Sequence, residues 1–171
     1  MSRFSVRGCL CVLLLVLAGG GVAAAQTTTG VPQLTIRTLD GRTFNLAAER
    51  GKWVIVNFWA TWCGPCIEEM PAISKYVAAH RDVTAIGLAY DRSPLAEIVK
   101  FVRKHPVDYP LAQVDMDHPP ADFAVPVALP TTYLIAPDGR VAKQFLGPVN
   151  AKLLDAAIAA AAPRGSAHAG S

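Results

Sequence analysis

The feature that most constrains this chain is a pair of cysteines placed directly after a short apolar run. Residues 53–58 read Trp-Val-Ile-Val-Asn-Phe, which has the length and composition of a strand buried on both faces. The sequence Cys-Gly-Pro-Cys follows at residues 63–66. Behind it, Met70 and Ile73 continue from Cys66 at helical spacing. The pattern predicts a buried strand, a dithiol and then a helix.

This placement gives the two sulfurs different chemistry. A cysteine where a helix begins meets unpaired backbone N–H groups and the helix dipole, and both stabilise a thiolate. We therefore expect Cys63 to be an exposed nucleophile with a low pKa. Cys66 lies one turn further along the same side, where it can attack a mixed disulfide on Cys63. Gly64 lets a partner's backbone approach closely, and Pro65 suits a first helical turn.

Other uses of a Cys-x-x-Cys pair fit this sequence less well. Haem attachment needs a histidine after the second cysteine, where this chain has Ile67. A zinc site needs a second pair of ligands, and the four histidines are dispersed: His80, His105, His118 and His168. A structural bridge across two residues closes almost no loop and would add little stability. We expect redox chemistry at the cysteine pair, with no metal and no other cofactor.

The first 25 residues have the pattern of an export signal. Arg3 and Arg7 precede an apolar run over residues 9–17, and three alanines at residues 23–25 supply a cleavage pattern. The run is shorter than the roughly 20 apolar residues of a spanning helix. We expect residues 1–25 to be a cleaved signal peptide, and the protein to act in the periplasm or at the cell exterior. An uncleaved membrane anchor is the alternative.

The composition of the chain without this segment excludes some kinds of structure and partner. Only Cys63 and Cys66 remain as cysteines, so the chain has no disulfide framework. Residues 26–171 hold 14 basic and 13 acidic side chains, with no run of Lys or Arg. This balance gives no electrostatic surface for nucleic acid or for an anionic membrane. We expect no nucleic-acid partner.

The strand patterns indicate an α/β fold with a mixed central sheet. Residues 33–39 and 42–46 flank an Asp-Gly turn and predict an N-terminal β-hairpin. Residues 83–89 form a second buried strand, and the intervening helix makes a βαβ unit. Residues 131–136 and 141–146 flank Pro-Asp-Gly-Arg, which is typical of an antiparallel hairpin.

Helices should flank this sheet. The helix behind the dithiol should be kinked at Pro71. Ser93 and Pro94 predict the N-cap and first turn of a helical insertion after the βαβ unit. Residues 151–162, preceded by Asn150 as a cap, predict a last helix.

The remaining segments set the limits of the domain. Residues 105–127 are rich in proline and irregular, with a short helix expected at residues 120–123. Residues 163–171 have the composition of a disordered tail. We expect one domain over residues 31–162, because a chain of this length can bury a core without further crosslinks.

The chain resembles the thioredoxin superfamily at residues 58–66, which read Phe-Trp-Ala-Thr-Trp-Cys-Gly-Pro-Cys. The leading hairpin, Glu-Met-Pro at residues 69–71 and Leu-Pro-Thr-Thr-Tyr-Leu-Ile at residues 129–135 are similar to its exported TlpA/ResA branch. The resemblance spans residues 31–160 and implies a thioredoxin fold.

The resemblance also implies a substrate-binding surface. The family's counterpart of Pro130 is a cis proline that faces the dithiol and leaves the backbone of Leu129 to pair with an incoming peptide. From the residues alone, Pro130 could equally be a trans proline that opens a strand. Trp62, Gly64 and Pro65 would complete this binding surface around the dithiol.

A carboxylate three residues after the second cysteine is shared with TlpA-like proteins. Cytoplasmic thioredoxins carry a buried acid on the preceding strand, where this chain has Asn57, which cannot accept a proton. The i, i+3 spacing places Glu69 on the face of Cys66. We therefore interpret Glu69 as the base that deprotonates Cys66. A solvated helix glutamate, as expected for Glu68, is the alternative.

The family implies a thiol:disulfide oxidoreductase that acts on protein disulfides or dithiols and receives electrons from a membrane thiol donor. In the ResA-like branch it would reduce apocytochrome c during cytochrome c maturation. We expect a monomer. An oxidase that donates its disulfide is the alternative, although Gly-Pro between the cysteines matches reducing thioredoxins, which lie near about −270 mV against about −120 mV for DsbA.

Two further classes are disfavoured by spacing. Copper-carrying relatives have one more residue between their cysteines, which argues against a metal chaperone. A peroxiredoxin is disfavoured because Ala60, and not threonine, stands three residues before Cys63.

Overall fold

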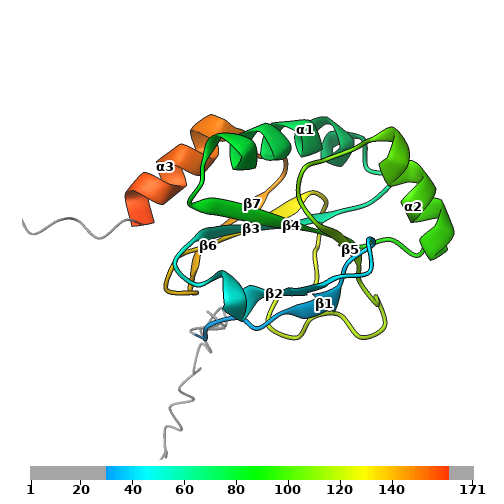
Figure 1. Ribbon diagram of the computed structural model, residues 1–171, viewed down its shortest axis with the longest axis horizontal. Coiled ribbons are helices and arrows are strands. Elements are labelled where there is room, and N and C mark those ends of the chain that lie inside the picture. Colours follow the sequence, from blue (N-terminus) through cyan, green and yellow to red (C-terminus); the bar gives the residue numbers. More distant parts are fainter. Residues whose placement is uncertain (1–29, 162–171) are drawn as a thin grey trace, which may run out of the picture.

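The computed structural model describes residues 30–161, in which seven strands and three α-helices form the fold (Figure 1). The predicted signal at residues 1–25 and the predicted tail at residues 163–171 lie outside the described residues. The elements in chain order are β1 (Thr35–Arg37), β2 (Thr43–Asn45), the short 3-10 helix η1 (Leu46–Glu49), β3 (Trp53–Trp59), α1 (Gly64–Ala79), β4 (Val83–Ala89), α2 (Leu95–Lys104), β5 (Leu111–Gln113), β6 (Thr131–Ile135), β7 (Val141–Leu146) and α3 (Ala151–Ala161).

A five-stranded mixed sheet with the order β5-β4-β3-β6-β7 forms the centre of the domain. β3, β4 and β5 are parallel to one another, while β6 is antiparallel to both β3 and β7. Every residue of β3 is buried, as predicted for a central strand that is covered on both faces. The predicted thioredoxin fold is confirmed.

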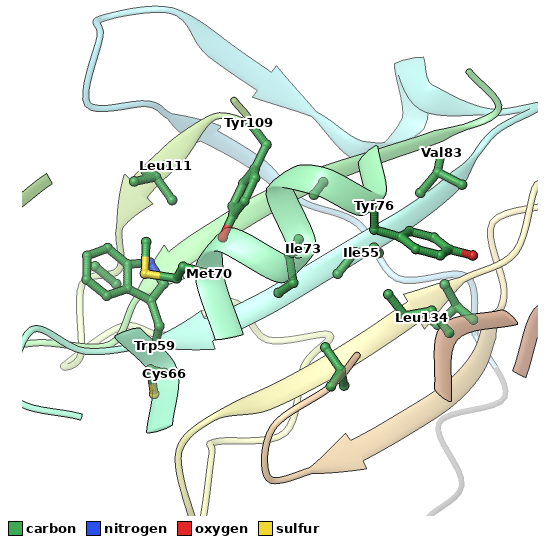
Figure 2. Close-up of a cluster of buried hydrophobic side chains, with 14 of the residues drawn as sticks. Ile55, Trp59, Cys66, Met70, Ile73, Tyr76, Val83, Tyr109, Leu111 and Leu134 are labelled. Atoms are coloured by element: carbon green, nitrogen blue, oxygen red, sulfur yellow. The ribbon is translucent and has the colours of Figure 1, made fainter. Parts of the chain in front are cut away.

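All three α-helices cover the same face of the sheet (Figure 1). Ile55 and Trp59 of β3 belong to the buried cluster on this face, together with Met70 of α1, Ile98 of α2 and Leu154 of α3. Figure 2 shows how Ile55, Trp59 and Met70 fill the space between α1 and the sheet. The side chain of Cys66 enters the same apolar cluster.

The N-terminal hairpin covers the opposite face of the sheet. β1 and β2 are antiparallel, and Gly41 in their turn has a φ of 84°, which suits a residue without a side chain. Phe44 of β2 packs in a second cluster with Phe58 of β3 and Tyr133 of β6. Phe123, from the segment between β5 and β6, completes this cover.

Two predictions between β4 and β6 were wrong. Residues 105–127 contain β5, a strand of three residues that lies parallel to β4, so α2 is the crossover helix of a second βαβ unit. Three residues are too few to show a strand pattern in the sequence. The helix expected at residues 120–123 is a turn, in which the N–H group of Phe123 donates to the carbonyl of Pro120 over 3.1 Å.

One of the two predicted helix caps is confirmed, and the other is wrong. Asn150 accepts a hydrogen bond from the N–H group of Leu153 over 3.0 Å, as a capping residue should. Ser93 does not cap α2, which has Pro94 at its N-cap and no side-chain cap. The N–H group of Ser93 instead donates to the carboxylate of Asp91 over 2.8 Å.

The sheet topology gathers several loops at one edge. Trp59 of β3 pairs with Ala89 of β4, which pairs in turn with Gln113 of β5, so these three parallel strands end at one level. β6 begins at the same edge, because Thr131 pairs with Phe58. The dithiol loop therefore lies beside the loop after β4 and the segment before β6.

The hairpin should contribute to stability as part of the core. Phe44→Ala should lower the free energy of unfolding by about 3 kcal/mol, because it leaves a cavity over Phe58. Thr43→Ala is the matched control, since Thr43 is exposed on the same strand and should change the free energy by less than about 0.5 kcal/mol. Urea unfolding of both variants measures this difference. Equal stability of the two variants would show that the hairpin is not part of the core.

Candidate active site

The two cysteines form a disulfide at the N-terminus of α1. Cys63 is the N-cap residue, and its Sγ atom accepts a hydrogen bond from the N–H group of Cys66 over 3.3 Å. Pro65 lies in the first turn, where its missing N–H group leaves no helical bond unmade. The first sulfur therefore lies where the helix dipole and the free N–H groups stabilise a negative charge.

Burial of the pair corrects one prediction. Cys63 is 5% exposed and Cys66 is fully buried, so Cys63 is not the exposed residue that was expected, although it is the more accessible of the two. The physical reason is tertiary packing, because both cysteines belong to the cluster that contains Trp59 and Ala60. In the disulfide form, access to sulfur is confined to the side of Cys63.

The residues around the sulfurs leave that side open. Trp62 is 69% exposed, and Gly64 and Pro65 are also exposed. Apart from its two chain neighbours and the backbone of its own helix, a methyl group placed on Gly64 would meet no atom of this chain within 4 Å. This geometry leaves room for a partner's backbone directly beside the disulfide.

The segment before β6 lies at the same edge. The peptide bond between Leu129 and Pro130 is cis, as the family resemblance implied. The carbonyl of Pro130 accepts a hydrogen bond from the N–H group of Gly147 over 2.9 Å, which ties this segment to the end of β7. Pro130 is buried and Leu129 is half-buried. The structure thus brings both residues to the sheet edge that carries the dithiol.

Glu69 is buried and not a solvated helix residue. It is 3% exposed, whereas Glu68 beside it is exposed. One carboxylate oxygen accepts from the side-chain amide of Asn57 over 2.7 Å, and the other accepts from the N–H group of Val149 over 2.8 Å. Burial raises the pKa of Glu69 to about 7, although both hydrogen bonds favour its charged form.

Two partners of Glu69 were missed by the sequence analysis. Asn57 was recognised only as a residue that cannot accept a proton, yet its amide binds both Glu69 and the hydroxyl of Thr132, over 2.7 and 2.9 Å. The alternation of β3 could have revealed this, because Asn57 shares the helix-covered face with Ile55 and Trp59. The contact from Val149 involves its backbone and has no sequence signature.

No grouping of three or more potential metal-ligating side chains occurs within residues 30–161. In that same part of the chain, no helix is long and apolar enough to span a membrane.

Comparisons with known proteins agree with this geometry. Residues 28–144 match the AhpC/TSA family. The thiol-disulfide oxidoreductase ResA of Bacillus thuringiensis (strain Al Hakam) is 32% identical over 118 residues, which cover 68% of this chain and 67% of ResA.

Solved structures show the same relationship. A putative thiol:disulfide interchange protein DsbE from Chlorobium tepidum is 25% identical with a TM-score of 0.66, covering 77% of this chain and 94% of the other. A secreted disulfide oxidoreductase of Mycobacterium tuberculosis, described as homologous to DsbE of E. coli, is 30% identical with a TM-score of 0.61, covering 75% of this chain and 96% of the other. The chain therefore belongs to the AhpC/TSA family, and within it to the thiol-disulfide oxidoreductases of the ResA and DsbE type.

Proposed function

We propose that this protein reduces disulfides of exported proteins, with Cys63 as the nucleophile and Cys66 as the resolving thiol. The observation that carries the proposal is the position of Cys63, which caps α1 and bonds to the buried Cys66 while the space at Gly64 stays open. A partner can reach the first sulfur and is excluded from the second.

The proposed reaction is two successive thiol–disulfide exchanges. In the reduced protein, the Cys63 thiolate attacks one sulfur of a substrate disulfide, and the other substrate sulfur leaves as a thiolate that takes up a proton. The Cys66 thiolate then attacks the sulfur of Cys63, which forms the Cys63–Cys66 disulfide and releases the second substrate thiol. Two electrons pass from the protein to its substrate. The sulfur pair carries both of them, so the reaction requires no metal or organic cofactor.

Glu69 is the proposed base for the second exchange. It lies three residues after Cys66 on α1, and a carboxyl group with a pKa of about 7 can both accept and return a proton at neutral pH. Asn57 and Val149 hold the two oxygens in place, so the carboxylate is oriented before the reaction begins.

The proposed substrate surface surrounds the opening at Cys63. Trp62 offers an exposed aromatic face, and aromatic residues provide large contact areas in protein interfaces. Gly64 and Pro65 border the sulfur, and the backbone at Leu129 and Pro130 would pair with an extended substrate segment.

The export and the substrate also belong to the proposal. The pattern of residues 1–25 supports a location in the periplasm or at the cell exterior, cleaved or anchored, and the similar M. tuberculosis protein is described as secreted. The ResA-like resemblance suggests apocytochrome c as a substrate and a membrane thiol donor as the source of electrons. We propose that the protein acts as a monomer.

The direction of electron flow is tested by the reduction potential. Equilibration of the purified protein with glutathione buffers should give a value closer to thioredoxin, at about −270 mV, than to DsbA, at about −120 mV. A value near or above about −150 mV would contradict the proposed reductant and identify an oxidase of the same fold.

The roles of the cysteines are tested by trapping. Cys66→Ser should accumulate mixed disulfides with substrate proteins through Cys63, because the resolving attack is lost. Mass spectrometry of the trapped species would identify the substrates, including any apocytochrome c. Cys63→Ser is the matched control and should trap none. Equal trapping by both variants would refute the assignment of the nucleophile.

Glu69→Gln tests the proposed base. The variant should slow the resolving exchange at pH 7 by about 10²-fold, and the pKa values of both thiols should fall because a neighbouring negative charge is removed. Gln can keep both contacts, since the Oδ1 atom of Asn57 has no partner and can accept from the Gln amide once the Asn57 amide turns. Stopped-flow reduction of a model disulfide measures the rate, and thiolate absorbance measures the pKa values.

Glu68→Gln is the matched control for both measurements and should behave like the parent, because Glu68 is exposed.

The raised pKa of Glu69 also predicts how the stability of the protein depends on pH. The folded state holds the proton up to about pH 7 while the unfolded state loses it near its ordinary value, so stability should fall by up to about 1.4 kcal/mol per pH unit between these values. Glu69→Gln should remove this fall. Parent-like rates and pH profiles in both variants would show that Glu69 is not the base.

A further inference from the structure

A second buried carboxylate lies beside the dithiol loop, in a place that the proposed reaction does not use. Asp91 follows β4 and is 2% exposed. Its Oδ2 atom accepts hydrogen bonds from the N–H group and the hydroxyl of Thr61, over 2.8 and 2.6 Å. Its Oδ1 atom accepts from the N–H group of Ser93 over 2.8 Å. The carboxylate thus joins the loop after β3 to the loop after β4.

The backbone of the turn that carries this carboxylate is itself held by a residue of β5. The side-chain amide of Gln113, at the end of β5, donates to the carbonyls of Asp91 and Ser93 over 3.1 and 2.9 Å. The turn of residues 91–93 is therefore fixed to the sheet by side-chain and backbone bonds. These bonds hold Asp91 in place where it bonds to Thr61.

Thr61 stands two residues before Cys63, in the turn that delivers the sulfur to α1. The N–H group of Cys63 donates to the carbonyl of Ala60 over 3.1 Å, which closes this turn around Thr61. Trp62, the residue between them, is exposed. The contacts with Asp91 are therefore the side-chain bonds that tie this turn to the rest of the sheet edge.

The charge of Asp91 suits this role. Burial alone would raise its pKa, but the hydrogen bonds from Thr61 and Ser93 outweigh burial and hold the pKa below its usual value. Asp91 is thus ionised at neutral pH, and bonds to an ionised acceptor are stronger than neutral ones.

We propose that Asp91 is a positioning residue for the dithiol: anchored by Gln113, it holds Thr61 and so keeps the sulfur of Cys63 within bonding reach of Cys66. Two sulfurs that are already placed for bonding form a disulfide more readily than two that must first be ordered. The carboxylate should therefore stabilise the disulfide form relative to the dithiol form. Its negative charge lies against the turn that leads to Cys63 and acts in the same direction, because negative charge disfavours the thiolate of the reduced protein.

Asp91→Asn tests this inference. Asn has a single acceptor oxygen, so its NH₂ group must face a donor at either Thr61 or Ser93. The equilibrium constant for reduction by glutathione should rise about tenfold, which makes the potential about 30 mV less negative. In thermal unfolding, the midpoint of the oxidised protein should fall further than that of the reduced protein. A residue with only a structural role would lower both midpoints equally and leave the constant unchanged.

Thr61→Val is the second variant and keeps the charge of Asp91. It removes only the hydroxyl contact, so the constant should rise in the same direction but less, by about threefold. If Asp91→Asn does not fold, the equilibrium constant of Thr61→Val is the test by itself, and an unchanged constant overturns the proposal.

Asp117→Asn is the matched control. Asp117 lies in the neighbouring loop, where it pairs with Arg92 over 3.0 Å and both side chains are exposed.

The control should leave the equilibrium constant and the difference between the two midpoints unchanged. An equal shift in all three variants would overturn the proposal.

The inference rests on the redox activity of the Cys63–Cys66 pair and not on the direction of electron flow. Failure of the proposed reductant role would appear in the potential of the parent protein, whereas failure of this inference would appear as variants that match the parent.

Discussion

The burial of β3 on both faces is the constraint on which the rest of the site depends. A strand covered by helices on one side and by the hairpin on the other cannot shift, so the residues that follow Trp59 leave the sheet at a fixed point. The same burial forces the side-chain NH₂ group of Asn57 to find acceptors inside the protein, because an unpaired donor there would be costly. It finds Glu69 and Thr132, and the carboxylate position on α1 is thereby tied to the strand.

The two buried carboxylates that we propose act on the dithiol lie in opposite environments. Glu69 is deeply desolvated and accepts two hydrogen bonds, so it can change its protonation near neutral pH. Asp91 accepts three hydrogen bonds and remains ionised. Environments that push the pKa values of two like groups apart commonly separate a proton-exchanging role from a fixed electrostatic one. Here, the first lies on the helix behind Cys66 and the second lies beside the loop before Cys63.

The parts of the fold that could be predicted are those with local patterns. The apolar run of β3, the cysteine spacing and the helical period behind it predicted the strand, the dithiol and α1. The position of Glu69 on the face of Cys66 stays a prediction from the i, i+3 spacing. β5 was too short to show a pattern, and the contacts of Asp91 join residues 30 positions apart in the sequence. The burial of Cys63 depends on side chains from other elements, so local position at a helix start predicted its cap but not its exposure.

The hairpin also determines when the domain can be completed as the chain is made. Phe44 shares a buried cluster with Tyr133, and the N–H group of Gln33 donates to Asp122 over 2.8 Å, across 89 positions of sequence. The hairpin can therefore complete its contacts only after β6 has left the ribosome. Such non-local contacts slow folding, because the long intervening loop must be ordered before the contact contributes. A chain that stopped before residue 131 would lack Tyr133 and Ile135, so part of the apolar surface of its hairpin and of β3 would remain in water, where other chains could bind it.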